Sequence, residues 1–224
     1  GLPGFTIRDY HPTGAFVQAA ARDFYCPILY ATSRYGDATL LGLDMLSEPV
    51  RGALLQRACD TGAAVLSPPL RLIQIADRSP GVLMAAAVYR TATTPPTVAA
   101  RRQALQGYLV AAFEVDDIVR RCIGLHLPLN AWLHIRDTDV RGFDGMLYRG
   151  NPWTRGAQPA TAQAPAAGGL TTTQTIPVAD RTWEFTCADA SAHTLSSEPH
   201  TSWIVLLVGI LTTALLSQHQ QQIL

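Results

Sequence analysis

Short runs of hydrophobic residues separated by turn residues fill the first part of the chain, and this pattern predicts several β-strands. Turn signals such as Pro12-Thr13-Gly14 and Tyr35-Gly36-Asp37 stand between the runs. Residues 15–24 fit a helical or irregular connector better than a strand. The predicted strands comprise residues 4–10, 25–32, 40–46, 63–75 and 81–90.

A helix is predicted from Glu48 to about Thr61, because apolar residues recur there at helical spacing and form one stripe. Ser47 suits the cap that precedes the helix, and Pro49 is tolerated in its first turn. Gly62 follows the last turn and can adopt the left-handed conformation that ends many helices. We expect the helix to pack on a sheet through the stripe, which consists of Val50, Leu54, Leu55 and Ala58.

Asp44 is a carboxylate within an apolar run, shortly before this helix. A carboxylate in that place can accept bonds from backbone N–H groups near the helix start and favours the positive end of the helix. We therefore expect a structural role for Asp44 rather than contact with a ligand.

The pattern breaks at residues 90–97, which are rich in threonine and proline, so we place the boundary between two halves there. In the second half, Asp116 suits the cap of a helix that runs through Arg120 to about Leu125. Residues 156–175 are rich in small residues, proline and threonine, which indicates a mobile loop. Strands are predicted at residues 105–115, 130–138, 145–150 and 181–188.

Together these elements indicate an α+β fold with two antiparallel sheets, each crossed by a helix. We expect one subdomain over residues 1–95 and a second over residues 96–198. Residues 199–224 contain no Asp, Glu, Lys or Arg and centre on TSWIVLLVGILTTALLS, which is typical of a transmembrane helix. A buried core helix is the alternative, because the most apolar part is shorter than the roughly 20 residues that cross a bilayer.

The composition is that of an ordinary folded protein, with 48% hydrophobic residues, 15% charged residues and a formal net charge of zero. This balance argues against a nucleic-acid partner. The four cysteines are widely separated and have no metal-ligand spacing, so we expect buried thiols and no metal, with a disulfide as the alternative. The chain begins without Met and lacks a signal-peptide pattern, as we expect of a fragment with further residues upstream.

The sequence shows no catalytic arrangement. None of the six histidines stands beside a Ser or Cys in a nucleophile motif. The neighbouring carboxylates of Asp116 and Asp117 would point apart on a helix, which favours capping over acid–base chemistry. No glycine motif suits a phosphate group. We therefore expect a binding module without a cofactor rather than an enzyme.

Three blocks of the sequence carry a resemblance to a known family: LGLDMLSEPVRGALLQRACDTGAAVLSPPLRLIQ, GVLMAAAVYR and GYLVAAFEVDDIV. In order and spacing they resemble the CHASE domain, the extracellular sensor module of plant cytokinin receptors and of many bacterial histidine kinases and diguanylate cyclases. The resemblance covers residues 4–137 and is weaker over residues 143–188. It implies two tandem PAS-like sheets, a distal and a proximal one, with a ligand in the distal sheet. It also implies that the residues before 199 lie outside the inner (plasma) membrane.

The resemblance further implies a set of ligand-binding residues. Plant receptors of the family hold an adenine ring with a carboxylate and a nearby threonine, and alignment places Arg51 and Ala85 at those positions. Because arginine can only donate hydrogen bonds, we expect an adenine-type cytokinin to bind poorly and hypothesise an anionic ligand instead. The alternative is that Arg51 lies on the solvent face of its helix. The implied site consists of Met45, Arg51, Ser67, Ile73, Ala85 and Tyr108.

The leading hypothesis is therefore the extracytoplasmic sensing region of a membrane receptor that binds a small molecule and works as a homodimer. Membrane lipid would surround residues 199–224, and a histidine kinase or diguanylate cyclase domain would follow Leu224. A membrane-anchored envelope hydrolase is an alternative, although it would need a nucleophile and an oriented base that the sequence does not show. A non-signalling anchor module is a third possibility.

Overall fold

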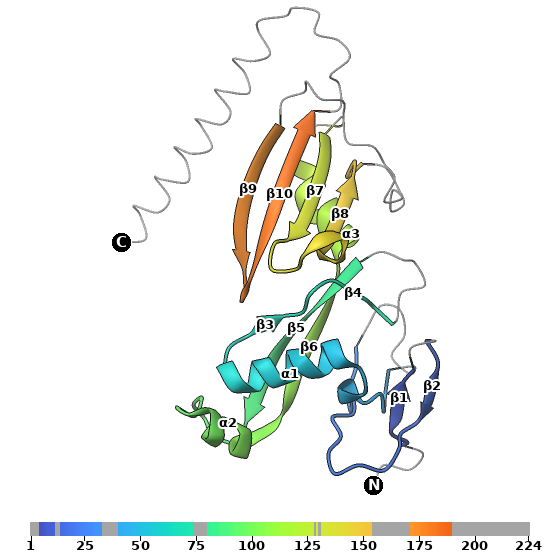
Figure 1. Ribbon diagram of the computed structural model, residues 1–224, viewed down its shortest axis with the longest axis vertical. Coiled ribbons are helices and arrows are strands. Elements are labelled where there is room, and N and C mark those ends of the chain that lie inside the picture. The colour runs from blue at the N-terminus through green and yellow to red at the C-terminus, as the bar shows by residue number, and fades with distance from the viewer. Residues whose placement is uncertain are drawn as a thin grey trace, which may run out of the picture. The chain divides into compact units, whose positions relative to one another are not determined.

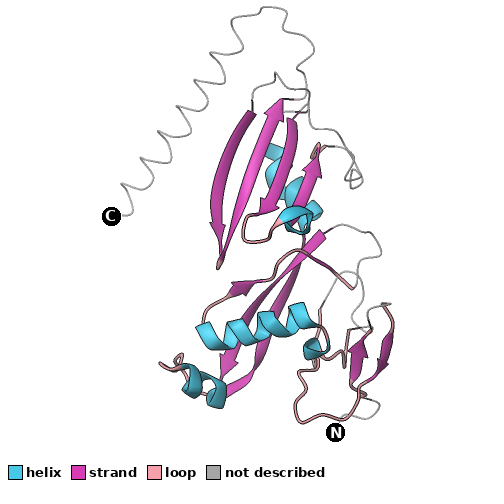
Figure 2. Cartoon of the chain, in the orientation of Figure 1, coloured by secondary structure: helices cyan, strands magenta, loops and turns pink. Residues whose placement is uncertain are grey.

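The computed structural model describes residues 5–11, 14–32, 40–73, 80–127, 129, 131–153 and 171–189. These residues form helices and antiparallel sheets, as Figure 1 and Figure 2 show. The predicted membrane-spanning segment, residues 199–224, lies outside them. Along the described ranges, no helix has the length and apolar composition that crossing a bilayer requires.

The first sheet is a hairpin of two short antiparallel strands, β1 (Arg8–Tyr10) and β2 (Phe16–Gln18). β1 lies within the strand predicted at residues 4–10, whereas β2 falls in the segment predicted as a connector, so that prediction is wrong at β2. Aromatic contacts across the strands explain the difference. The Phe16 ring meets the Tyr10 ring edge to face at 6.2 Å, and the Arg8 guanidinium lies 5.0 Å from the Phe16 ring centre.

The two apolar runs between β2 and the long helix were predicted as strands, and both predictions are wrong because the runs form only isolated bridges. Gly42 turns the chain with a φ of +81°, and Met45–Ser47 then form the short 3-10 helix η1. The Asp44 carboxylate accepts a hydrogen bond from the N–H of Leu46 at 3.0 Å, which fixes the start of η1. Local hydrogen bonds at this corner thus replace a strand ladder.

The long helix α1 (Pro49–Thr61) confirms the helix prediction, including its end at Gly62, which has a φ of +69°. The predicted cap, however, is wrong. Glu48 caps the helix, because its carboxylate accepts from the N–H groups of Val50 and Arg51 at 3.0 and 3.1 Å. Ser47 instead donates its hydroxyl to the carbonyl oxygen of Asp44.

The second sheet has β5 (Pro80–Tyr89) at its centre. On one side β5 pairs with β3 (Val65–Leu66) and β4 (Leu70–Arg71), and on the other side with β6 (Leu105–Glu114). The single strand predicted at residues 63–75 is therefore two short strands, because two consecutive prolines between them cannot donate to a ladder.

β6 was placed in the second half of the chain, and that placement is wrong because β6 pairs with β5 along its whole length. The connection between them contains a helix that was not predicted, α2 (Val98–Ala104), which Thr97 caps by accepting from the N–H of Ala100. The threonine and proline residues before α2 therefore mark a hairpin connection rather than the end of a sheet. The division at residue 95 into two functional subdomains stays a prediction.

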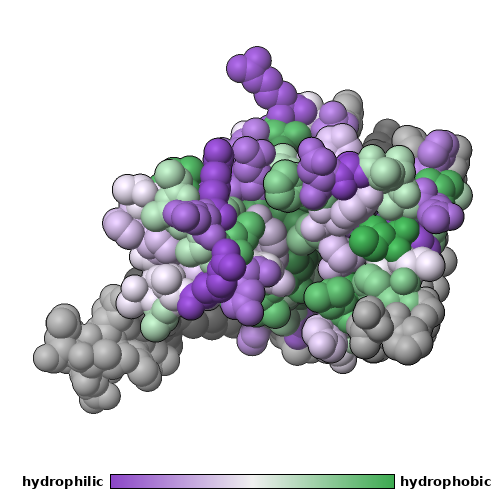
Figure 3. Space-filling model, turned by 90° about the horizontal axis from the view of Figure 1, so that it is seen from below, coloured by the Kyte–Doolittle hydropathy of each residue, from purple (hydrophilic) through white to green (hydrophobic). Residues whose placement is uncertain are grey.

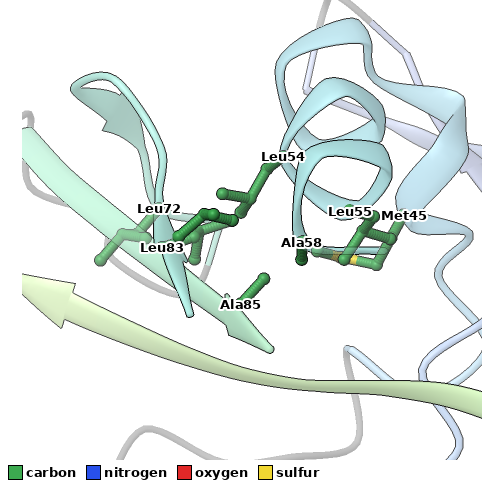
Figure 4. Close-up of a cluster of buried hydrophobic side chains, with 8 residues drawn as sticks. Met45, Leu54, Leu55, Ala58, Leu72, Leu83 and Ala85 are labelled. Atoms are coloured by element: carbon green, nitrogen blue, oxygen red, sulfur yellow. The ribbon is translucent and has the colours of Figure 1, made fainter. Parts of the chain in front are cut away.

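One face of the second sheet is covered by α1 and η1, as Figure 1 and the close-up in Figure 4 show. The side chains buried between them form what we call the first core cluster. Leu54, Leu55 and Ala58 of the predicted stripe belong to it, whereas Val50 is only half-buried. The cluster consists of Met45, Leu54, Leu55, Ala58, Val65, Leu72, Leu83 and Ala85.

The third sheet has the strand order β8-β7-β10-β9. It confirms the strands predicted in this part of the chain with β7 (Ala131–Asp137), β8 (Met146–Gly150) and β10 (Arg181–Asp189). β9 (Thr171–Val178) lies partly in the predicted mobile loop, so that prediction is wrong from residue 171 onward. Its threonines are β-branched and pair along β10, which favours a strand. Residues 156–170 of the predicted loop lie outside the described residues.

The helical segment before β7 changes its winding twice. It begins as α3 (Val115–Ile118) and continues as a π-helix η2 (Val119–Ile123) and a 3-10 helix η3 (Gly124–His126). The prediction that Asp116 caps this segment is wrong. Asp116 lies in the first turn and forms an ion pair with Arg120.

A second core cluster joins the second and third sheets. Leu66 of β3 and Val82 of β5 pack there with residues from the helical segment and from the third sheet. The α+β class with antiparallel sheets is thus confirmed. The cluster consists of Leu66, Val82, Val115, Val119, Leu133, Ile135, Leu147 and Trp183.

Candidate ligand-binding site

The candidate site is the face of the second sheet that α1 and η1 cover. The strand register places Ala85 of β5 opposite Val110 of β6, and Ala87 opposite Tyr108, so these side chains share one face. Ala85 is fully buried, Tyr108 and Val110 are half-buried, and Ala112 further along β6 is exposed. The face is therefore closed over β5 and only partly covered over β6.

The structure brings three of the six predicted residues together on this face. Met45 and Ala85 belong to the first core cluster, and Tyr108 packs against it. Two residues from the N-terminal segment, Cys26 and Ile28, pack against the same cluster. Sequence reasoning missed both, although the apolar run at residues 25–32 was the signal that this segment is partly buried.

Apolar side chains also reach the surface of this part of the molecule. In Figure 3, hydrophobic residues surround a hollow near the middle of the face seen from below, next to long hydrophilic side chains. Leu29 and Tyr30 of the N-terminal segment are exposed, whereas Leu109 is exposed on the face of β6 opposite to Tyr108. Such mixed surfaces suit small molecules that have an apolar body and a few polar groups.

Arg51 is buried, with only 6% of its surface exposed, so the alternative that it lies on the solvent face is wrong. Its Nη1 donates to the Glu48 carboxylate at 3.1 Å, and its Nη2 donates to the carbonyl oxygen of Arg71 at 3.0 Å. The guanidinium also lies 5.3 Å from the centre of the Tyr10 ring. Burial lowers the pKa of Arg51, and the Glu48 carboxylate opposes that effect. Arg51 thus joins α1 to β4 and β1, and an incoming anion would have to compete with Glu48.

The other two predicted residues lie at the margins of the face. Ser67 is fully buried, and its Oγ accepts from the N–H of Leu83 at 2.9 Å while it donates to the carbonyl oxygen of Pro68 at 2.8 Å. Its hydrogen-bonding capacity is therefore largely used within the protein. Ile73 is half-buried in the turn after β4 and does not belong to the first core cluster.

Tyr108 places a polar group at the partly covered edge of the face. Burial raises the pKa of its hydroxyl above the ordinary value, and the neighbouring Cys59 adds to the rise. The hydroxyl therefore stays protonated at physiological pH and can donate or accept a hydrogen bond. This is the chemistry with which a tyrosine orients a bound molecule.

Asp44 has the structural role that the sequence predicted. Its side chain is fully buried, and its Oδ1 accepts from the N–H groups of Cys26 and Leu46 at 2.8 and 3.0 Å. Its Oδ2 accepts from the Arg22 guanidinium at 2.8 Å. Asp44 thus fixes the N-terminal segment beside η1 and holds Cys26 against the first core cluster.

The Cys26 thiol is expected to react slowly with alkylating reagents. Burial raises its pKa to about 11, and the Asp44 carboxylate adds to the rise, so about one thiol in a thousand would be ionised at pH 8. Cys122 is exposed and serves as the internal reference. We expect alkylation of Cys26 by iodoacetamide at pH 8 to be about 100-fold slower than that of Cys122, as measured by peptide mass spectrometry. Equal rates in the folded protein would contradict this assignment, and equal rates in denaturant are the control.

Metal ligands are not grouped on the described part of the chain, where no three His, Cys, Asp or Glu residues are arranged to hold an ion. What the structure presents is an apolar face with a buried floor, a protonated tyrosine and a buried arginine at its edge. Such an arrangement suits contact with a small molecule that has an apolar body and a few polar groups.

Comparison with known proteins identifies the family. The family model of the CHASE domain matches residues 1–148, which is more than half of the chain, so the chain belongs to the CHASE domain family. The resemblance found in the sequence is thereby confirmed. A curated relative, the probable histidine kinase 6 of Oryza sativa subsp. japonica, is 32% identical over 106 residues. That match covers 47% of this chain and 10% of the relative, so the chain spans about a tenth of the relative's length.

Among solved structures, the chain is similar to the ligand-binding domain of the amino acid chemoreceptor PctC of Pseudomonas aeruginosa PAO1, in complex with GABA. The match covers 84% of this chain and 77% of that domain, at 12% identity and a TM-score of 0.38.

Proposed function

We propose that this chain is the extracytoplasmic sensing region of a transmembrane signal-transduction receptor. The observation that carries the proposal is membership of the CHASE family, whose domains are extracellular sensor modules. The histidine kinase among the relatives supports a cytoplasmic output domain, a histidine kinase or a diguanylate cyclase. Residues 199–224 would form a membrane helix surrounded by lipid. Ligand binding would shift this helix, and two copies of the chain would transmit the shift as a small displacement relative to each other.

The proposed ligand is a small molecule that contacts the face formed by Met45, Ala85 and Tyr108. Ser67 and Ile73 would complete the site at its margins. An anionic ligand would suit Arg51, because it could replace Glu48 at Nη1 while Nη2 kept its bond to the carbonyl oxygen of Arg71. Conversely, an adenine-type cytokinin would bind poorly, since Arg51 offers the ring no acceptor.

The ligand class is tested by thermal shift of the whole chain with small carboxylates and their neutral amides. Arg51→Gln keeps a donor for the Arg71 carbonyl but loses the charge. Arg102→Ala is the matched control, because Arg102 is an exposed arginine that pairs with Asp60 near the end of α1. We expect a carboxylate to stabilise the unsubstituted chain and the Arg102 variant and to lose about tenfold or more in affinity for Arg51→Gln. Undiminished affinity in the Arg51 variant would remove Arg51 from the site.

The receptor proposal has a separate and simpler test, which is to read the gene beyond Leu224. A kinase or cyclase domain in the same reading frame would support it. A stop codon directly after Leu224 would count heavily against signalling.

A further inference from the structure

Leu66 of β3 lies between the second sheet, to which it belongs, and the third sheet, against which its side chain packs. Its side chain is buried in the second core cluster, together with Leu133 and Trp183 of the third sheet. The next residue, Ser67, exchanges two hydrogen bonds with Leu83, which belongs to the first core cluster beneath the candidate site. A displacement of β3 at the candidate site would therefore reach the third sheet within one residue.

The backbone N–H and carbonyl oxygen of Leu66 form hydrogen bonds with two side chains, one from the β9–β10 hairpin of the third sheet and one from α1. Its N–H donates to Oδ1 of Asp180 at 2.7 Å, and its carbonyl oxygen accepts from Nη2 of Arg57. The Nε of Arg57 donates to Oδ2 of Asp180 at 2.8 Å, which closes a ring of three partners. We call this ring the Asp180 bracket. One oxygen of the Asp180 carboxylate thus binds β3 and the other binds α1.

Asp180 stands at the tip of the hairpin between β9 and β10, the strand that leads out of the sensing region. Ala179 beside it has a φ of +55°, which is uncommon for a residue other than glycine and turns the tip so that Asp180 meets β3. From the tip, β10 runs to Asp189, and the chain continues toward the apolar residues 199–224. The hairpin therefore connects β3, at the edge of the second sheet, to β10, the last described strand before residues 199–224.

We propose that Asp180 is a positioning residue that couples the candidate ligand-binding sheet to the third sheet through Leu66. The proposal rests on the proposed sensing function and names the contact through which that sheet's state is passed on. The plainer interpretation is that Asp180 only covers the open edge of β3. The two differ in one measurable way, because an edge cover changes stability, whereas a coupling residue changes how far a disturbance of the first core cluster spreads.

The test disturbs the first core cluster and follows hydrogen exchange in β10 of the whole chain. Leu55→Ala supplies the disturbance, because Leu55 is fully buried in that cluster and belongs to α1. It is introduced into the unsubstituted chain, into Asp180→Ala and into Asp139→Ala. Asp139 is the matched control, since its carboxylate accepts from the N–H of Thr182 within the third sheet.

We expect Leu55→Ala to speed exchange of residues 181–189 about tenfold in the unsubstituted chain and in the Asp139 variant, and less than about threefold in Asp180→Ala. Asp180→Asn keeps an acceptor for one of the two partners and should give an intermediate response. If Leu55→Ala does not fold, Leu55→Val is the milder disturbance. An equal response with and without the Asp180 carboxylate, or no response of β10 in any background, would overturn the proposal.

No ligand enters this experiment, so its outcome is independent of the ligand search. If no ligand were found and the exchange result were positive, the sensing function would lose its support but the coupling proposal would stand. A ligand that binds, together with a negative exchange result, would keep the sensor and reject Asp180 as its coupling residue.

Discussion

Replacing Asp44 with alanine is expected to lower the free energy of unfolding by about 3 kcal/mol. The carboxylate is fully buried and accepts from the N–H groups of Cys26 and Leu46 and from the Arg22 guanidinium. Alanine would leave the two backbone N–H groups without this acceptor, and Arg22 with Asp9 as its remaining carboxylate partner, at a corner where the N-terminal segment meets η1. A buried donor without a partner costs more free energy than one hydrogen bond gains on balance, because the donor has also lost the hydrogen bond to water that it makes in the unfolded chain. Urea unfolding of the whole chain measures the loss.

Two companion variants separate the contributions of the two carboxylate oxygens. Asp44→Asn keeps one oxygen for the two backbone N–H groups and should lose about half as much. Asp9→Ala removes the other carboxylate that pairs with Arg22, at a part-exposed position, and should cost less than about 1 kcal/mol. If Asp44→Ala cost no more than Asp9→Ala, the buried backbone bonds would not be what holds this corner.

The elements that the sequence predicted correctly are those whose signals are local. The helix α1 follows from a stripe of apolar residues and from the glycine at its end, both within the segment itself. β7 and β10 follow from the alternation of their own side chains. The strand prediction for residues 40–46 is wrong because the structure of this run depends on hydrogen bonds between Asp44 and residues elsewhere in the chain. Its apolar composition therefore indicated burial correctly but not the backbone conformation.

The candidate site shows the same limit. Family resemblance pointed to Met45, Ala85 and Tyr108, and the structure gathers these three on one face. Helical spacing alone placed Arg51 one residue beside the apolar stripe, which made an exposed side chain the alternative. Its burial is set by a carbonyl on β4, twenty residues further along, and by the ring of Tyr10. No window of sequence around Arg51 contains those partners.

β6 was misplaced for a related reason. A break in periodicity rich in threonine and proline looks the same whether it ends a sheet or connects two neighbouring strands. Only the register, which pairs Gly81 with Glu114 and Ala85 with Val110, distinguishes the two cases. Because Tyr108 comes from β6, the candidate site needs this pairing in order to exist.

Gly42→Ala is expected to cost about 3 kcal/mol, of which about 1 kcal/mol is the penalty for a left-handed backbone. Gly42 has a φ of +81°, and a Cβ added there would overlap the backbone carbonyl oxygen of Thr6. The segments around it cannot easily yield, because the Gly42 carbonyl accepts from the N–H of Arg8 and its own N–H donates to the carbonyl of Ile28. The remainder of the cost therefore comes from separating these segments.

Gly142→Ala is the matched control, because Gly142 has a φ of +73° and open space where a Cβ would lie. It should lose only the backbone penalty of about 1 kcal/mol in urea unfolding. The two variants also differ at the candidate site, since the segment bonded to Gly42 holds Cys26 and Ile28 against the first core cluster. We therefore expect alkylation of Cys26 to become faster in Gly42→Ala and to stay slow in Gly142→Ala. Equal losses of stability together with unchanged alkylation would mean that Thr6 moves aside freely, and that the N-terminal segment is not held at Gly42.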